Sequence, residues 1–315
     1  MKQTPLYNGA STLNTVLDPQ RLSQGTRNAP GVIELAKAVN VSIDDRGLVT
    51  LRRGDALLKA GDFHSLFCDG GDCFVVQELI DYAVILRVTS LSPITTETVV
   101  SGLSKGLRTE FKQVNEDTFW SNGVQCGYIR SGINHAWPDG SYLGPDADVD
   151  FLTSPPIPNH MAFVKGGKCA VAIGNAVFLN HEPFQYGLFA PALGYIGFES
   201  DVSMLCEVTG GFYASDTKRI WFFRKVDGGW YNYRQELAYT APALEWSLSP
   251  EVIMLRDVGY DLPGSGRVWA STDGLCVGTD DGQVFCRTKD AVVYPSGYTS
   301  GACLVDDFVV IHTAS

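Results

Sequence analysis

The sequence predicts an all-β protein built as a β-propeller, and three observations carry this prediction. Helical patterns are scarce, while 33 of the 315 residues are Gly, 35 are aromatic (13 Tyr, 16 Phe, 6 Trp) and only 19% are charged. Such a composition is typical of strands joined by many turns. Short apolar runs broken by Gly, Asp and Asn recur along the chain. They repeat at about 40–50 residues, which is the spacing of propeller blades.

Each recurring unit reads as a hairpin: a β-forming run, a polar turn and a second β-forming run. Turns centred at residues 70, 117, 166, 216 and 274 are 47, 49, 50 and 58 residues apart. A single blade leaves two apolar faces uncovered, and a ring of blades covers both. With about 280 residues in units of about 48, we expect five or six blades. A pair of β-sandwiches or a barrel would also alternate and turn, and it stays an alternative.

The two ends of the predicted propeller each supply an incomplete blade. One hairpin spans residues 38–51, with residues 44–47 as its turn, and the last spans residues 302–313, with Asp306 and Asp307 at its turn. Joined in one sheet, they would close the ring and leave no free edge. We therefore expect the ring to be closed by the N- and C-terminal hairpins together.

Residues 1–30 differ from the rest of the chain because Pro, Gly and Asn are frequent and no hydrophobic period is visible. We expect an extended N-terminal arm there and a propeller domain over residues 31–315. A loose tail and a strap laid on a neighbouring subunit are the two interpretations of the arm. The only helix expected is short, over residues 32–39, after Pro30 and Gly31.

Charge and hydropathy restrict the function classes. Acidic residues outnumber Lys and Arg by 35 to 24, giving a net charge of −11, which argues against a grip on nucleic acid over the whole surface. No apolar run reaches the roughly 18–20 residues of a membrane span. The N-terminus lacks the apolar segment of a signal peptide, so we expect synthesis in a cytosol.

The eight cysteines are expected to be free thiols. Four residues separate Cys68 from Cys73 and nine separate Cys276 from Cys286, and neither spacing matches paired zinc ligands. In a reducing compartment, buried thiols act as small hydrophobic groups. We therefore expect no disulfide between Cys68 and Cys73 and no metal at Cys276 and Cys286.

No catalytic, cofactor-binding or metal-binding motif is recognised, so the sequence predicts no catalytic residue, no cofactor, no metal ligand and no enzymatic activity. The histidines are scattered without a ligand pattern. Their positions are His64, His135, His160, His181 and His312. The tryptophans are expected to pack between blades rather than to stack on sugars. They are Trp120, Trp137, Trp221, Trp230, Trp246 and Trp269.

Three local clusters of charge were weighed against simpler interpretations. Asp146, Asp148 and Asp150 lack the Gly and the closing Glu of a calcium loop, so a solvated acidic loop is favoured. Asp280 and Asp281 precede Gly282 and indicate a hairpin turn. The basic group near the first hairpin is too small for a nucleic-acid patch, and docking to a partner protein or solvated strand ends are favoured. It comprises Arg46, Arg52, Arg53 and Lys59.

The stretch from Leu6 to Asp55 resembles the start of a class of tailed-phage virion proteins. The resemblance rests on Tyr7-Asn8-Gly9, on residues 40–47 (NVSIDDRG) and on the basic residues 51–54 (LRRG). Further stretches match the same class as loose blade patterns. They are residues 119–123 with 128–132 and Trp137, residues 174–179 with 181–184, and residues 267–278.

The resemblance implies a structural virion protein of a short-tailed phage, in the tail nozzle or head-to-tail connector hub. Such proteins form a ring around the DNA ejection channel, so it implies further copies of this chain as partners. Other implied partners are the adaptor, portal-proximal proteins, and tail fibres or needle. DNA would pass without specific binding, in a virion assembled in the host cytoplasm.

The acidic composition independently suits a channel lumen that does not grip phosphate. The alternative function is a carbohydrate-binding or glycan-cleaving propeller, such as a receptor-binding or sialidase-like protein. An intracellular propeller scaffold is a third reading.

Overall fold

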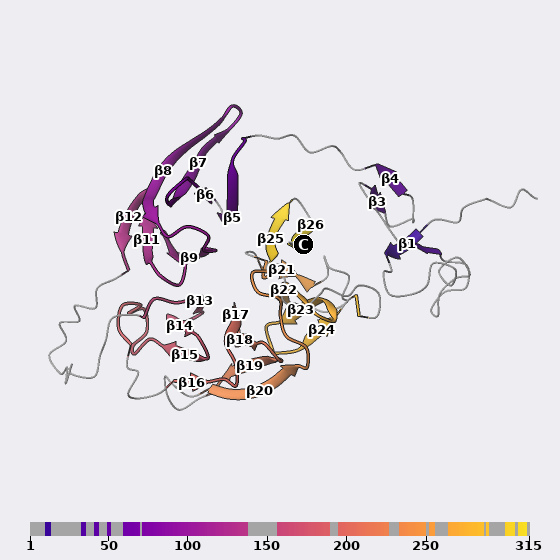
Figure 1. Cartoon of the computed structure of the whole chain (residues 1–315). Coiled ribbons are helices and arrows are strands. Elements are labelled where there is room, and N and C mark those ends of the chain that lie inside the picture. Colours follow the sequence, from indigo (N-terminus) through magenta and orange to yellow (C-terminus); the bar gives the residue numbers. More distant parts are fainter. Residues whose placement is uncertain are drawn as a thin grey trace, which may run out of the picture.

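The computed structural model describes residues 59–69, 71–137, 156–189, 195–226, 233–249, 252–255, 264–286 and 288–289. Outside these ranges it gives the backbone of six further strands. Five four-stranded antiparallel sheets follow one another along the chain and stand around a common centre (Figure 1). The predicted all-β propeller is confirmed.

We number these sheets as blades 1 to 5. Blade 1 contains β5 (Asp62–Asp69), β6 (Asp72–Glu78), β7 (Ala83–Leu91) and β8 (Ile94–Leu103). Blade 2 contains β9 (Glu110–Val114), β10 (Asp117–Ser121), β11 (Cys126–Arg130) and β12 (Ile133–Ala136). Blade 3 contains β13 (His160–Val164), β14 (Lys168–Ile173), β15 (Ala176–Leu179) and β16 (Ile196–Gly197). Blade 4 contains β17 (Val202–Val208), β18 (Gly211–Asp216), β19 (Ile220–Lys225) and β20 (Tyr233–Tyr239). Blade 5 contains β21 (Ile253–Met254), β22 (Ser265–Ser271), β23 (Gly274–Thr279) and β24 (Val284–Cys286).

The first strands of the blades lie side by side around the centre. β5 contacts β9, β9 contacts β13, β13 contacts β17, and β17 contacts β22 of blade 5. The last strand of each blade lies at the periphery in Figure 1. Every blade therefore presents the start of its sequence unit to the axis.

Apolar cores fill the spaces between adjacent blades. Phe67 and Phe74 of blade 1 stack on Phe111 of blade 2, with ring centroids 5.8 and 6.1 Å apart. Phe119 of blade 2 lies 4.7 Å from Phe163 of blade 3. Because both faces of an inner blade are covered, all six residues of β18 are buried, whereas the outer strand β20 is only partly covered. This is how a ring of blades satisfies apolar surface on both faces.

The chain ends supply three two-stranded sheets. They are β1 (Ala10–Leu13) with β2 (Ile33–Leu35), β3 (Val41–Ile43) with β4 (Val49–Leu51), and β25 (Ser300–Val305) with β26 (Phe308–Thr313). Both predicted terminal hairpins form, but they lie in separate sheets, so the expectation that they share one blade is wrong. β25 instead contacts β5, at the sixth position of the ring between blades 5 and 1 (Figure 1).

Two local expectations are also corrected. Ile33–Leu35 is a strand that pairs in parallel with β1, inside the segment expected to be a helix. Its β-branched Ile and its partner strand outweigh a helical pattern that is too short to be stable alone. The turn predicted near residue 216 joins β18 to β19, whereas β17 and β18 are joined through Thr209 and Gly210.

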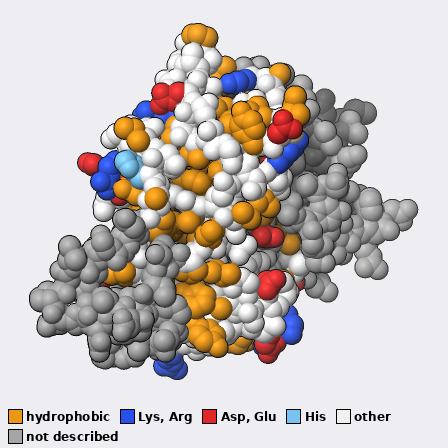
Figure 2. Space-filling model, turned by 60° about the vertical axis from the view of Figure 1, so that its left-hand side comes forward, with side chains coloured by type: hydrophobic (Ala, Val, Ile, Leu, Met, Phe, Trp, Pro, Cys, Tyr) orange, Lys and Arg blue, Asp and Glu red, His pale blue; other side chains and the backbone are white. Residues whose placement is uncertain are grey.

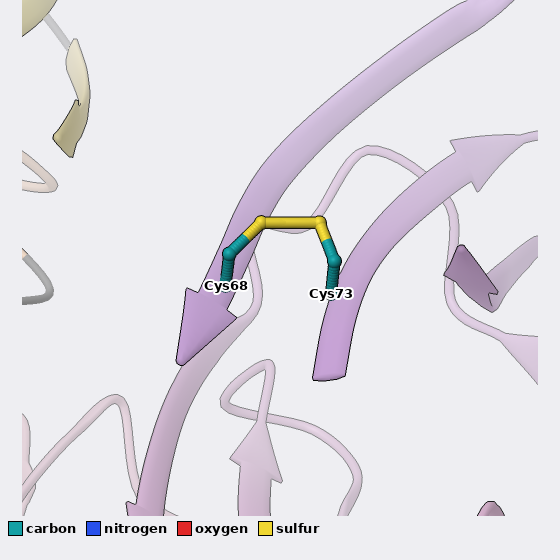
Figure 3. The surroundings of a disulfide bond; sticks show 2 residues. All are labelled: Cys68 and Cys73. Carbon is teal, nitrogen blue, oxygen red and sulfur yellow. A yellow bond between two sulfur atoms is a disulfide. The ribbon is translucent and has the colours of Figure 1, made fainter. Parts of the chain in front are cut away.

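Cys68 and Cys73 form a disulfide (Figure 3), which corrects the expectation of free thiols there. The two residues face each other across β5 and β6, and their Cα atoms are 4.1 Å apart. A tight hairpin thus brings together cysteines whose spacing was judged only against zinc motifs. Five other cysteines in the described part of the chain are free thiols.

On the face seen in Figure 2, acidic and basic side chains are interspersed around a band of apolar ones. The net negative charge is therefore not gathered into one patch on that face. Within the described residues, no helix has the length and apolar character needed to cross a membrane.

Candidate functional site

Five charged side chains from four blades meet at the centre of the ring. Glu110 and Lys112 lie on β9, His160 begins β13, Glu207 lies near the end of β17, and Arg267 lies on β22. Lys112 of blade 2 contacts Glu207 of blade 4, and blades that are not neighbours can meet only near the axis. We call these five residues, together with Glu245, the axial cluster.

Ion pairs of alternating sign run through the axial cluster. Lys112 Nζ lies 2.9 Å from Glu207 Oε2 and 3.8 Å from Glu110 Oε1. The other oxygen of Glu110 lies 3.1 Å from His160 Nδ1. The guanidinium of Arg267 donates to Glu207 and completes that end of the chain of pairs. All five side chains are at least 85% buried, since the most exposed of them, Glu207, has 15% of its side-chain surface accessible.

The pKa shifts show which groups are charged. Burial alone lowers the pKa of His160, but hydrogen bonds and charges of Glu110 and Glu245 outweigh it and raise the pKa to about 9. Burial alone raises the pKa of Glu207, but Arg267 and Lys112 outweigh it and keep that pKa below its ordinary value. At neutral pH the cluster therefore contains an imidazolium and an ionised Glu207.

An irregular segment of blade 5 brings Glu245 and Trp246 to the cluster. Leu244 N–H donates to Ala270 O, and Ser249 N–H donates to Val268 O, both at 2.8 Å. Five residue steps thus face two on the partner strand, so the residues between form a bulge. Such bulges redirect side chains out of the regular pleat.

The bulge is held by a buried side chain and contains a left-handed residue. The Ser247 hydroxyl bonds to Leu244 O at 2.6 Å and accepts from Ala270 N–H at 3.1 Å, replacing missing ladder bonds. Trp246 has a φ of +65°, a conformation that costs a non-glycine residue about 1 kcal/mol or more. Its ring lies 5.0 Å from the His160 ring, and Glu245 Oε1 lies 3.6 Å from His160 Nε2.

A pocket of about 260 Å³ opens beside the other end of the axial cluster. Glu207 and Arg267 line it together with polar and apolar residues of blades 3, 4 and 5. These are Phe163, Lys165, Val208, Thr209, Val252, Ser265, Gly266 and Asp280. Asp280 accepts from Thr209 N–H at 2.9 Å and from Ser265 Oγ at 2.6 Å, so it joins blade 4 to blade 5.

The structure separates the residues considered in the sequence. His160 lies in the axial cluster, whereas His64 pairs with Glu78 in blade 1 and His135 stacks on Tyr128 in blade 2. His181 lies 3.7 Å from Glu182 in the loop after β15. Asp280, Asp281 and Gly282 form the turn between β23 and β24, as predicted, with Gly282 at a φ of +94°.

The tryptophans divide in the same way. Trp120, Trp137 and Trp269 are buried in blade packing, as expected, but Trp246 belongs to the bulge. Lys59 Nζ donates to Thr96 Oγ1 at 2.7 Å. Other residues considered lie outside the side chains that the structure describes. They are Asp146, Asp148, Asp150, Trp230, Arg46, Arg52, Arg53 and His312.

Cys276 and Cys286 face each other across β23 and β24 as free thiols. Within the described ranges, no group of three or more His, Cys, Asp or Glu side chains is placed to hold a metal ion.

Glu110, His160, Glu207, Glu245 and Arg267 were not singled out as a site in the sequence. One signal was available: Glu110 and His160 stand at equivalent positions, the first residues of successive inner strands. Aligning the blade units on their first strands would have placed both at the axis.

Comparisons with known proteins match structures but no family model and no curated protein. A protein from Lactobacillus plantarum matches with 14% identity, over 82% of this chain and 80% of its own, at a TM-score of 0.49. XC5397, a gluconolactonase from Xanthomonas campestris, matches with 12% identity over 76% and 79% at a TM-score of 0.46. The WD40 domain of Neurospora crassa Pan2 matches with 10% identity over 80% and 75% at a TM-score of 0.44.

The gluconolactonase among these matches corrects the expectation that the chain is not an enzyme. The lack of a recognised catalytic motif does not exclude activity, because propellers build sites from residues on several blades. At these identities the likenesses concern the fold alone. The chain is thus a β-propeller with five four-stranded blades and a charged, largely buried axial cluster.

Proposed function

We propose that this chain is a structural subunit of the tail of a short-tailed phage, in the nozzle or the head-to-tail connector hub. Copies of it form a ring around the DNA ejection channel and contact other tail proteins. The resemblance of residues 6–55 to such virion proteins supports this, as do the later blade patterns. Its location is the virion, after assembly in the host cytoplasm.

One structural observation carries the proposal: the segment with the strongest resemblance contributes to none of the five blades. β1–β2 and β3–β4 are separate two-stranded sheets, and β25–β26 occupies the sixth ring position with two strands. An isolated hairpin is marginally stable, and an open sheet edge invites pairing with another chain. The arm of one copy is therefore suited to bind a neighbouring copy, as a strap in a ring.

The paired charges of the axial cluster occupy the centre of each propeller, so DNA passes between subunits of the ring and not through a single propeller. The net charge of −11 weakly repels DNA phosphate and favours passage.

The test uses virions and a variant of the full chain. Mass spectrometry and cryo-electron microscopy of virions should place the protein at the tail axis. Thr50→Pro removes a ladder donor from β4 and should convert a purified ring to monomers, whereas Thr50→Val should remain assembled. Absence of the protein from the tail, or a wild-type chain that sediments as a 34 kDa monomer under all conditions, contradicts the proposal.

A second candidate function is a carbohydrate-binding or glycan-cleaving propeller. The specific observation in its favour is the bulge that aims Glu245 and Trp246 at the axis beside His160.

A further inference from the structure

We infer that the axial end of the propeller where β9 and β13 begin is a binding site for a neutral sugar ring, built from His160, Glu245 and Trp246. The inference develops the second candidate function and is independent of the virion role. Four observations carry it, all from the described blades 2, 3 and 5.

The first observation is an uncommon backbone arrangement at this position. The bulge interrupts the ladder with β22, and Trp246 adopts a left-handed φ within it. Packing alone does not require this, because Ser247 and Ser249 are fully buried and anchor the segment on both sides of the excursion. Strained residues of this kind cluster at ligand sites.

The second observation is an incompletely satisfied donor. His160 is 3% exposed, and its Nε2 has no hydrogen-bond partner. Glu245 Oε1, at 3.6 Å, is near enough for an ion pair but too far for a good hydrogen bond. Buried polar atoms in native proteins normally find a partner in the protein, in water or in a ligand.

The third observation is the accessibility of the acceptor. The Glu245 side chain is 44% exposed, whereas Glu110, on the opposite side of the His160 ring, is 12% exposed. A ligand can therefore approach Glu245 and the Nε2 side of the imidazolium, while Glu110 holds the Nδ1 side in place. Met161 N–H also donates to Glu110 at 3.3 Å and fixes that carboxylate.

The fourth observation is the balance of charge. The axial cluster contains three acidic residues, Glu110, Glu207 and Glu245, and three basic ones, Lys112, His160 and Arg267. An ionic ligand would add an uncompensated charge next to buried pairs, which is costly. A neutral ligand avoids that cost.

A sugar has the chemistry that these groups require. A hydroxyl can donate to the Glu245 carboxylate while accepting from His160 Nε2, and a neighbouring hydroxyl can share the carboxylate. The C–H face of a pyranose suits the ring of Trp246, in keeping with sites that combine an aromatic wall with few convergent polar groups. The ligand class is therefore a neutral pyranose, free or at the end of a glycan.

Binding is tested with the full chain and the methyl glycosides of glucose, galactose, mannose, rhamnose and N-acetylglucosamine, each added alone. We expect saturation transfer from the protein to at least one of them in ligand-detected NMR. Glu245→Gln keeps the shape of the side chain and removes its charge, and it should weaken the dissociation constant of that glycoside roughly tenfold or more. Trp246→Ala should abolish saturation transfer.

Two matched controls separate the site from general effects. Glu199→Gln changes a carboxylate at the exposed ion pair with Lys218, and Phe184→Ala changes an exposed aromatic residue that also has a positive φ, +63°. Both should bind like wild type. Absence of transfer to every glycoside, or equal transfer in Glu245→Gln and wild type, overturns the inference, whatever the protein's place in a virion. Because Glu245→Gln is a mild change at a half-exposed side chain, a folding defect in Trp246→Ala does not affect this outcome.

Discussion

The interfaces between adjacent blades and the axis where the blades meet are stabilised by different physical interactions. Between blades, aromatic and aliphatic side chains pack without charge, as around Phe119, whose ring lies within 6 Å of four other aromatic rings. At the axis, the buried contacts are ion pairs between residues of blades 2, 3, 4 and 5. Apolar packing is insensitive to pH and salt, whereas buried ion pairs depend on the protonation of each member.

This difference teaches where structure and function divide in the molecule. Removing charge from the axis by apolar substitution could stabilise the ring, because burying ions carries a desolvation cost. The axial cluster is thus poorly explained by stability, whereas the aromatic interfaces are well explained by it.

The largest effect is expected from an interface between blades. Phe119→Ala should lower the free energy of unfolding by about 4 kcal/mol, because it leaves a cavity among Tyr128, Trp137 and Phe163. Urea denaturation at two pH values measures it, and the loss should be equal at both. Phe184→Ala, on a 67% exposed side chain, serves as the control. A strongly pH-dependent loss for Phe119→Ala would erase the contrast drawn here.

A somewhat smaller loss is expected at the axis. Glu207→Gln should lower the free energy of unfolding by about 3 kcal/mol, because it leaves Arg267 and Lys112 buried without their carboxylate. The same denaturation experiment applies, with Glu199→Gln at an exposed pair expected to leave the midpoint unchanged. If Glu207→Gln is as stable as wild type, the ion pairs at the axis are not formed in solution.

The pH dependence sharpens the comparison further. The pKa of His160 is raised from 6.5 to about 9 in the folded chain, so its charge contributes stability that is complete below pH 6.5. That contribution, about 3 kcal/mol, is lost as the pH rises through about 9. The difference in unfolding free energy between wild type and His160→Gln should therefore shrink over this window.

The variant is needed because Lys168 acts in the opposite direction. Burial and the nearby charge of Lys225 lower the pKa of Lys168 to about 7, so its contribution to stability rises with pH above that value. This contribution cancels when wild type is compared with His160→Gln. Parallel stability profiles for the two proteins would show that His160 carries no raised pKa.

The smallest effect is expected from the local covalent contact. Reduction of the Cys68–Cys73 bond should lower the free energy of unfolding by about 2 kcal/mol, since the closed loop is short. Denaturation with and without dithiothreitol measures it, and the double variant Cys68→Ser, Cys73→Ser should not respond to reductant. Alkylation of both thiols in protein never exposed to reductant would contradict the disulfide.

The sequence allowed the blades to be predicted, and the reason is local. Hairpins such as those around residues 115–117 and 166–167 depend on polar turns between β-forming runs only a few residues apart. The repeat of these units then required a ring, because each blade has two apolar faces. Even the misplaced turn at residue 216 fell within the correct blade.

The axial cluster could not be predicted in this way, because its members are 42 to 157 residues from one another between blades, as Glu207 to Glu245 and Glu110 to Arg267 illustrate at 38 and 157 residues. Their proximity follows from ring closure and from the bulge after Leu244, neither of which leaves a motif. The pairing of Cys68 with Cys73 was missed for a different reason. Its signal, two cysteines flanking a tight turn, was present but was compared only with metal-ligand spacings.

The central claim is that ring closure places a permanently charged His160 between Glu110 and Glu245, and its pKa tests this most directly. Long-range ¹H–¹⁵N NMR spectra of the histidine rings, recorded over a pH series and assigned with His160→Gln, follow the protonation of that ring in the intact protein. The account predicts an imidazolium that persists past neutral pH and titrates with a pKa of about 9. A His160 ring that is already neutral at pH 7 would show that the carboxylates do not flank it, and it would contradict the axial cluster.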